Sequence, residues 1–161
     1  MIDLSPAQAA DRIAKLLVTP ESRTLDFKRI SDKHKKIIET VCAFANSEGG
    51  LLALGVGDAK DLRAGDKPQS RLWGVEENPE GFDDLRRLLL QRFTPALPRL
   101  HWLRMPCTLR DGKPGHVVLL RVEKSNQVHS VVGNGTWTRM DASNRELSAA
   151  EIADLTYQRG V

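Results

Sequence analysis

The sequence predicts an α+β fold in which a mixed, mostly antiparallel β-sheet is flanked by helices. Apolar residues recur at helical spacing in four segments. An almost unbroken apolar run at residues 51–56 is typical of a strand that is buried on both faces. Two turn signals, Asp111-Gly112 and Gly133-Asn134-Gly135, separate strand-like segments in the second half of the chain. The helix-patterned segments are residues 5–17, 31–47, 81–93 and 148–158.

The 161 residues are enough for one domain with a sizeable core and leave no room for a second domain of ordinary size. We expect a single unit made of a helical extension, residues 1–19, and a core, residues 20–161. Ser5 followed by Pro6 supplies the cap and the first-turn residue of the opening helix. We expect that helix to pack on the domain itself or on a neighbouring chain.

The first strand of the core is expected at residues 24–28. Its alternation places two apolar side chains on the core face and brings Asp26 and Lys28 together on the other face. Glu21 lies just before this strand, where a chain that leaves a loop can turn its carboxylate toward Asp26. The segment therefore gathers two acids and a lysine, with an ordinary surface ion pair as the alternative interpretation.

The second helix-patterned segment, with Ser31 or Asp32 as its N-cap, is followed by the pair Gly49-Gly50. Glycine at this position stops a helix with a left-handed C-terminal cap. Asp58 then follows the buried strand at residues 51–56, and the carboxyl end of an internal strand is a common place for a ligand-binding residue. The alternative is that Asp58 simply begins a turn.

The rest of the chain contains strand-like segments and one polar loop. The loop, residues 61–70, lies beside Asp58 in the sequence and would shape the entrance to a site there. The closing strands join through the two turn signals, and a final helix ends the chain. The expected strands are residues 72–75, 100–109, 116–122, 128–132 and 136–140.

Three tryptophans invite interpretation as platforms for unpaired bases, because aromatic faces stack on bases. Trp102 alternates with polar neighbours in an expected strand and is expected in the core. Trp137 lies next to a turn and is expected to be partly exposed. A structural role is favoured for both, and for Trp73.

The protein is mildly basic, with a formal net charge of +3. This charge permits nucleic-acid binding without requiring it. Cationic residues gather where the first strand joins the second helix, as a surface that follows phosphates requires. A solvated helix face is the alternative for the lysines after Asp32. The gathered residues are Lys28, Arg29, Lys33, His34, Lys35 and Lys36.

Several classes of protein are not indicated. No apolar run approaches the roughly 20 residues of a transmembrane helix, and the four histidines and two cysteines lack the spacing of a zinc site. Glycine spacing at residues 50–57 fits neither a dinucleotide fingerprint nor a P-loop, so no ATP or nucleotide cofactor is expected. The two cysteines suggest a reducing compartment, and we expect a cytoplasmic protein without a membrane partner.

Several motifs follow one another in a specific order. E-S-R-T-L-D-F-K begins at Glu21, a helix ending C-A-F-A-N-S-E-G-G and the run L-L-A-L-G-V-G-D come next, and G-T-W-T-R with A-S-N-R-E lies near the end. In order and spacing these motifs resemble the Schlafen AlbA_2 domain, from about Glu21 onward. The resemblance implies nucleic-acid binding. The Schlafen members most similar in function are metal-dependent endoribonucleases that cut transfer RNA at a site of three acids.

The resemblance assigns site residues by position. Asp26 stands where glutamate is usual, and Gly57 stands where the Schlafen proteins tend to have a first aspartate. Asp61 is therefore an alternative third acid. Lys28 matches the lysine of the motif and is assigned to a phosphate oxygen. The catalytic acids, which are also the metal ligands, are Glu21, Asp26 and Asp58.

Three carboxylates suit Mg²⁺ or Mn²⁺, hard cations that prefer oxygen ligands. The resemblance therefore implies a nucleic-acid-binding domain that cleaves structured RNA, such as transfer RNA, with a divalent metal. The alternative is a noncatalytic DNA- or RNA-binding module, and a third interpretation is a domain that binds an acidic protein. RNA is favoured over DNA if the protein is catalytic. The resemblance also implies a homodimer, because the Schlafen nuclease core resembles two such modules side by side that form a groove around the substrate.

The last basic residues of the motifs have two interpretations. Arg139 and Arg145 are expected either to contact phosphate or to pair with Glu146 or the carboxylates of the final helix. The residues expected to contact nucleic acid are Lys28, Arg29, Lys33, Lys35, Lys36, Arg139 and Arg145.

Overall fold

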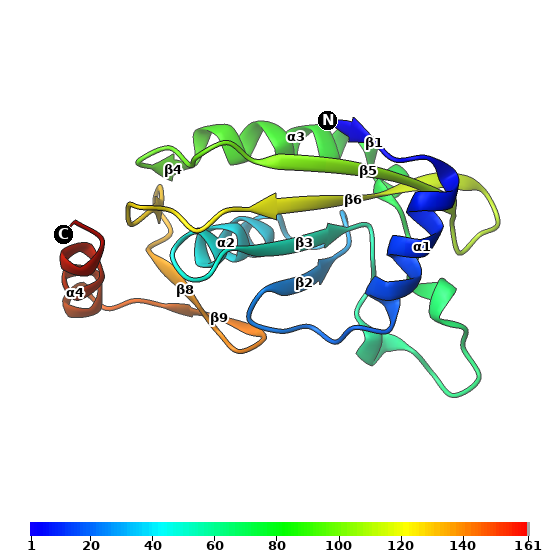
Figure 1. Cartoon of the computed structure of the whole chain (residues 1–161), viewed down its shortest axis with the longest axis horizontal. Helices are drawn as coiled ribbons and strands as arrows, with labels where there is room; N and C mark the ends of the chain where they lie inside the picture. The colour runs from blue at the N-terminus through cyan, green and yellow to red at the C-terminus, as the bar shows by residue number, and fades with distance from the viewer. Residues whose placement is uncertain (161) are drawn as a thin grey trace.

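The computed structural model describes residues 1–160, and its centre is a five-stranded mixed β-sheet (Figure 1). The strand order is β1-β5-β6-β3-β2. β1 is parallel to β5 and β2 is parallel to β3, while β6 is antiparallel to both β5 and β3. Together with the helices around it, this sheet confirms the predicted α+β class. The strands span Ile2–Asp3 (β1), Leu25–Lys28 (β2), Gly50–Leu54 (β3), His101–Thr108 (β5) and Pro114–Val122 (β6).

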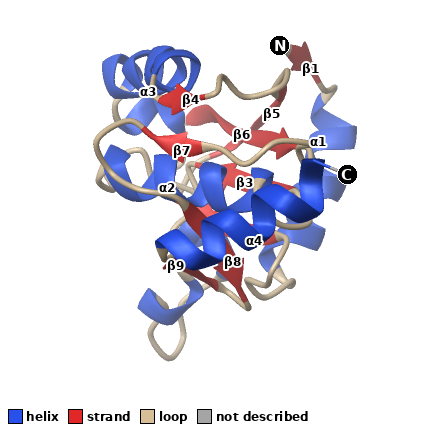
Figure 2. Ribbon diagram, turned by 90° about the vertical axis from the view of Figure 1, so that its left-hand side faces the viewer, coloured by secondary structure: helices blue, strands red, loops and turns tan. Residues whose placement is uncertain are grey.

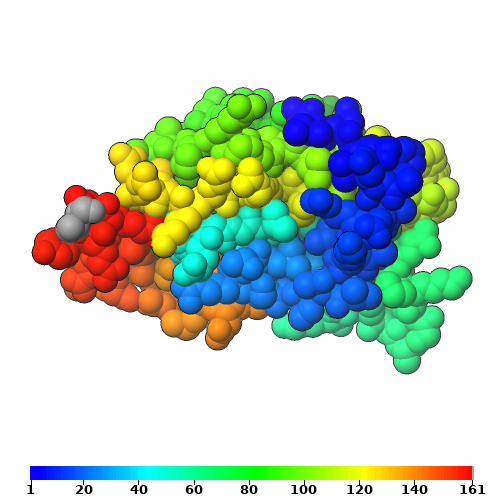
Figure 3. Space-filling view, viewed as in Figure 1, coloured from blue at the N-terminus to red at the C-terminus, as the bar shows by residue number. Residues whose placement is uncertain are grey.

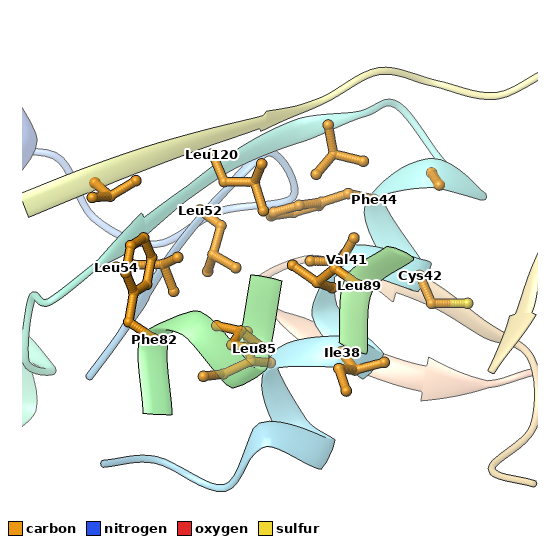
Figure 4. Packing of buried hydrophobic residues seen from close by; sticks show 14 of the residues in the cluster. Ile38, Val41, Cys42, Phe44, Leu52, Leu54, Phe82, Leu85, Leu89 and Leu120 are labelled. Atoms are coloured by element: carbon orange, nitrogen blue, oxygen red, sulfur yellow. The ribbon is translucent and has the colours of Figure 1, made fainter. Parts of the chain in front are cut away.

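Helices cover both faces of the sheet. On one face, Phe44 of α2 and Leu85 of α3 pack against Leu52 and Leu120 of the sheet (Figure 4). On the other face lies α1. No helix within residues 1–160 is long and apolar enough to cross a membrane. The helices span Pro6–Leu17 (α1), His34–Ala45 (α2), Pro79–Gln91 (α3) and Ala149–Gly160 (α4).

The α1 face of the sheet is formed by the alternate side chains of its strands. Leu25 and Phe27 of β2 lie in this cluster, as the alternation predicts, and Ile13 of α1 packs into it. Asp26 and Lys28 consequently point to the opposite face. The sheet therefore has a hydrophobic core on each side, and the expected acid and lysine share one side.

The first 19 residues, expected as a helical extension, are integrated into this fold. β1 pairs with β5 and forms one end of the sheet. At the start of α1, Ser5 Oγ accepts a hydrogen bond from the Gln8 N–H, and Gln8 Oε1 accepts one from the Ser5 N–H. This capping box confirms the predicted helix start.

The second helix begins later than expected. The predicted N-cap, Ser31 or Asp32, is wrong, because Lys33 precedes the first helical residue and makes no side-chain cap bond. Asp32 Oδ2 instead accepts a hydrogen bond of 2.8 Å from the backbone N–H of Arg29. A short acidic side chain can close a local turn as readily as it caps a helix, and here Asp32 closes the turn after β2.

The helix ends as predicted. Gly49 has a φ of +76°, and its N–H donates to the Phe44 carbonyl at 2.8 Å. A Cβ atom at this position would lie 2.7 Å from the carbonyl oxygen of Val122. The left-handed backbone and this close approach to β6 both require glycine.

One strand prediction is wrong, because residues 72–75 contain an isolated bridge between Leu72 and Val56 and the start of a 3-10 helix at Val75. The predicted turn at Gly133-Asn134-Gly135 is present, and the strands expected before and after it are present in shortened form. These two strands pair with other strands. Ser130–Val131 (β7) pairs with Phe93–Thr94 (β4), and Trp137–Met140 (β8) pairs with Ser143–Glu146 (β9), beside α4 (Figure 2). The hairpin through Asp111-Gly112, which joins β5 to β6, is confirmed.

Candidate functional site

Glu21 and Asp26 lie next to each other at β2, a strand at the edge of the sheet. Their carboxyl groups share a hydrogen bond. Glu21 Oε2 also accepts a hydrogen bond of 3.1 Å from the backbone N–H of Phe27. The even-numbered backbone groups of β2 bond to β3, so the Phe27 N–H points away from the sheet. Glu21 thus satisfies a donor on the open edge of the sheet.

Asp26 is buried, with only 2% of its surface exposed, and lies between two cations. Lys28 Nζ is 3.2 Å from its Oδ1, and Arg139 Nη1 is 3.1 Å from its Oδ2. Arg139 also donates to the backbone carbonyl groups of Ser22 and Leu25. Since Arg139 belongs to β8, this buried ion pair connects the small β8–β9 sheet to the edge strand.

The pKa values of the two carboxyl groups are shifted in opposite directions. Burial, together with the hydrogen bond and negative charge of Asp26, raises the pKa of Glu21 from 4.5 to about 7. Burial alone would raise the pKa of Asp26, but the hydrogen bond to Glu21 and the charges of Lys28 and Arg139 outweigh it and lower this pKa. The pair therefore keeps its proton on Glu21, which titrates near neutral pH.

The structure places Arg139 inside the protein rather than at a surface where it would contact phosphate. Its side chain is almost completely buried, and its partner is Asp26 rather than the expected Glu146. A buried guanidinium that already binds a carboxylate has no free edge to offer a ligand. Arg145 pairs with Glu151 of α4 at 2.8 Å, as one of its two interpretations predicts.

Asp58 lies near the carboxyl end of β3 but apart from the Glu21–Asp26 pair. Its Oδ1 accepts a hydrogen bond of 2.9 Å from the Lys60 N–H, which is the turn that the alternative interpretation predicts. Within residues 1–160, no group of three or more His, Cys, Asp or Glu side chains is placed to hold a metal ion. The three-carboxylate cage expected of Glu21, Asp26 and Asp58 is not assembled in this arrangement, and Asp61 does not complete it either.

A cavity of about 560 Å³ opens where β2 and β3 end. These strands are parallel, so Arg29, which follows β2, and Asp58, which follows β3, reach the same edge of the sheet. Residues 59–71 fold around the cavity and protrude beside α1, at the lower right of Figure 3. Residues of the predicted polar loop therefore line this cavity. The charged residues that line the cavity are Arg29, Lys60, Arg63, Arg71, Arg110, Asp58 and Asp61.

Trp73 forms the aromatic centre of this cavity. The Cζ atom of Arg29 lies 3.5 Å from the ring centroid, and the Cζ atom of Arg110 lies 3.8 Å from it. Two groups this close to one centroid cannot share a face, so the ring is sandwiched between the two guanidinium groups. Both faces are occupied, which leaves no face of Trp73 for a base and instead fixes two arginines.

Arg71 is the buried cation of the cavity, with 3% of its surface exposed. Its Nε donates to the Gly57 carbonyl at 2.9 Å, and its Nη1 donates to the Leu17 carbonyl at 3.2 Å. Its Nη2 is buried and has no hydrogen-bond partner among the residues that the structure describes. A buried donor without an acceptor is unfavourable.

The family model described as Schlafen, AlbA_2 matches residues 21–148 of the chain. This segment is well over half of the sequence and contains both the Glu21–Asp26 pair and the cavity. The chain belongs to the Schlafen AlbA_2 family. In this AlbA_2 domain, α1 precedes the matched segment and α4 follows it.

The AlbA_2 domain also resembles a solved structure, the crystal structure of the DIP2311 protein from Corynebacterium diphtheriae. The TM-score is 0.57 at 18% sequence identity, so the likeness concerns the fold alone. The match covers 95% of this chain but only 32% of the Corynebacterium chain. No curated protein matches this AlbA_2 domain.

The residues predicted to contact nucleic acid lie in different parts of the AlbA_2 domain. Arg29 lines the cavity, Lys28 binds Asp26, and the helix lysines lie on the surface, with Lys36 Nζ 3.7 Å from Glu39. Sequence reasoning missed several cavity residues. Lys60 and Arg63 could have been found in the loop after Asp58, but Arg110 comes from the β5–β6 turn and only the tertiary structure brings it there. The further exposed lysines are Lys33 and Lys35, and the missed residues are Lys60, Arg63, Arg71 and Arg110.

Proposed function

We propose that this AlbA_2 domain binds nucleic acid by its phosphate groups at the cavity around Trp73. The observation that carries the proposal is the concentration of five cationic side chains at one edge of the sheet. Four of the five are arginines, whose planar forks match phosphate oxygens. The overall charge of only +3 is therefore less informative than its distribution.

Binding to single-stranded RNA, transfer RNA and duplex DNA, followed by fluorescence anisotropy, tests the proposal. Affinity should fall steeply between about 50 mM and about 200 mM salt, because phosphate contacts release counterions. The double variant Arg63→Glu/Arg110→Glu should bind at least about tenfold more weakly, since it reverses two charges of the cavity.

Arg99→Glu is the matched control for this experiment. Arg99 is exposed like Arg110 but lies outside the cavity, before the start of β5, whereas Arg110 follows the end of that strand. If the cavity variant binds as tightly as the wild type, or if Arg99→Glu weakens binding equally, nucleic acid is not bound at the cavity.

Cleavage of RNA is a second candidate, favoured by the Glu21–Asp26 pair beside Lys28. A carboxyl group with a pKa near 7 is suited to donate or accept a proton at neutral pH. Mg²⁺ or Mn²⁺, which the family resemblance implies, would meet two adjacent carboxylates here instead of three. Two carboxylates do not form the three-acid site that the resemblance implies.

Incubation of transfer RNA with the protein, with Mn²⁺ or with a chelator, tests cleavage. The informative variant is Glu21→Gln, which keeps the shape of the side chain and removes its titration. Metal-dependent cutting that is lost in Glu21→Gln, while RNA binding persists, supports the enzyme. Binding without cutting under either condition supports the noncatalytic module.

A further inference from the structure

We propose that the cavity around Trp73 receives a phosphate monoester at the end of a nucleic-acid chain, rather than a phosphodiester within it. This inference rests on the proposed function, because it assumes that nucleic acid is bound at the cavity. It specifies which part of the nucleic acid enters.

The charge of the cavity is the first argument. Five cationic side chains and two carboxylates line it. Arg29 also donates from Nε and Nη2 to the carboxylate of Glu77, and the negative charge of Glu77 offsets the positive charge of Arg29. The lining residues and Glu77 therefore leave a formal charge of about +2. A phosphate monoester carries about −1.5 to −2 at neutral pH, whereas a phosphodiester carries about −1.

The free donors of the cavity are the second argument. Arg110 is fixed against Trp73, and no side chain among residues 1–160 pairs with its guanidinium. Stacking leaves the N–H edge of such a group available to an anion. The cavity thus offers one preorganised arginine fork to an anion.

The arrangement of the donors is the third argument. They come from separate segments of the chain: Arg29 after β2, Lys60 and Arg63 after β3, Arg71 before Trp73, and Arg110 after β5. A group that is surrounded in this way needs acceptor atoms in several directions. A terminal phosphate presents three unsubstituted oxygens, while a phosphodiester presents two and continues into the chain on both sides. The volume of about 560 Å³ is within the range of small-ligand cavities.

Three oligonucleotides of one sequence test the inference, one with a 5′-phosphate, one with a 3′-phosphate and one with hydroxyl groups at both ends. We expect at least about tenfold tighter binding of one phosphorylated form than of the hydroxyl form, because charge-assisted contacts are lost without the phosphate. Arg110→Ala should remove most of this preference. Arg110→Lys, which keeps the charge but not the fork, should retain part of it, and Arg99→Ala should leave it unchanged.

The outcomes separate this inference from the proposed function. Equal affinity for all three oligonucleotides would overturn the inference and leave nucleic-acid binding intact. Equal weakening of all three by Arg110→Ala would also overturn it. Competition by a nucleoside monophosphate at the same concentration as the oligonucleotide would assign the cavity to free nucleotides instead. Failure to bind any oligonucleotide at low salt would refute the proposed function itself.

Discussion

Glu21 and Arg139 together close the open edge of the sheet at β2. Glu21 accepts the N–H of Phe27, and the Leu25 carbonyl accepts from both the Ser22 N–H and Arg139, so these backbone groups at the edge are occupied and cannot pair with another strand. The same two residues flank Asp26. Residues that the motif assigns to catalysis and binding thus also complete the sheet.

Replacing Glu21 by glutamine should change how stability depends on pH. The folded protein holds a proton on Glu21 up to a pKa of about 7, against 4.5 ordinarily. This group therefore contributes stability that is complete below pH 4.5 and is lost as the pH rises through about 7. In Glu21→Gln this part of the pH dependence should vanish, which measurements of Tm between pH 4.5 and about 7 would show.

Glu48→Gln is the control for that measurement, because Glu48 is an exposed glutamate that lies 3.7 Å from Arg23. It should keep the wild-type slope of Tm against pH. The same slope in Glu21→Gln as in the wild type would show that Glu21 does not hold the proton. Asp26, whose pKa is lowered, affects stability in a different pH range. Its contribution to the free energy of unfolding is lost only as the pH falls below 3.8.

Removing Arg139 should destabilise the protein strongly. Arg139→Met leaves Asp26 buried without its closest arginine partner, and breaking a buried ion pair in this way costs about 3 to 5 kcal/mol. Urea denaturation of wild type and variant measures this difference in the free energy of unfolding. Arg145→Met, which breaks a surface pair, should change it little. Similar values for the two variants would contradict the structural role of Arg139.

At the scale of elements, α4 is held differently from the other helices. None of its described side chains is buried. Arg159 near its end donates to the backbone carbonyl groups of Asn46 and Ser125, and Glu151 near its start binds Arg145. Polar contacts at its two ends, rather than an apolar face, therefore position this helix beside the body of the protein (Figure 2).

Arg159→Ala should loosen α4 without unfolding the protein. Loss of the two contacts to backbone carbonyl groups should speed the hydrogen exchange of the α4 amides, because segments with few buried contacts open locally. The amides of the buried helix α2 should exchange at their wild-type rate. Hydrogen exchange followed by mass spectrometry measures both helices in one sample, and an unchanged α4 would refute this account of its attachment.

Local sequence signals predicted elements well where one residue has one strong preference. Ser5 and Gly49 mark a helix start and a helix end correctly, because a capping hydroxyl and a left-handed backbone are local requirements. Asp32 is not the predicted N-cap but accepts the Arg29 N–H, because a short acidic side chain serves several local structures. The turn at Gly133-Asn134-Gly135 formed as predicted, but the pairing of β7 with the distant β4 was not readable from local signals.

At the scale of the whole molecule, one sheet carries a hydrophobic core on each face. Ile13 of α1 belongs to one core and Leu85 of α3 to the other. The strands that separate the cores contribute side chains to both. We therefore expect neither core to melt without the other, and the domain to unfold in one transition.

Ile13→Ala and Leu85→Ala should each lower the free energy of unfolding by about 2 to 5 kcal/mol, because each leaves a cavity in a core. Both should shift one common transition, measured in urea by circular dichroism and by tryptophan fluorescence. Arg12→Ala, on the exposed side of α1, should change stability by less than about 0.5 kcal/mol. Two separate transitions in either core variant would show that the cores are independent.

The sequence by itself determined the α+β class, the family, most helix and strand positions, and the proximity of Glu21, Asp26 and Lys28. These features depend on periodicity and on residues close together in the chain. Only the tertiary structure decided that Asp58 lies apart from the acid pair, that Arg139 is buried against Asp26, and that Arg110 joins Arg29 on Trp73. The physical reason is that Arg139 and Asp26 lie 113 positions apart and Arg110 and Trp73 lie 37 apart, so only folding brings these partners together.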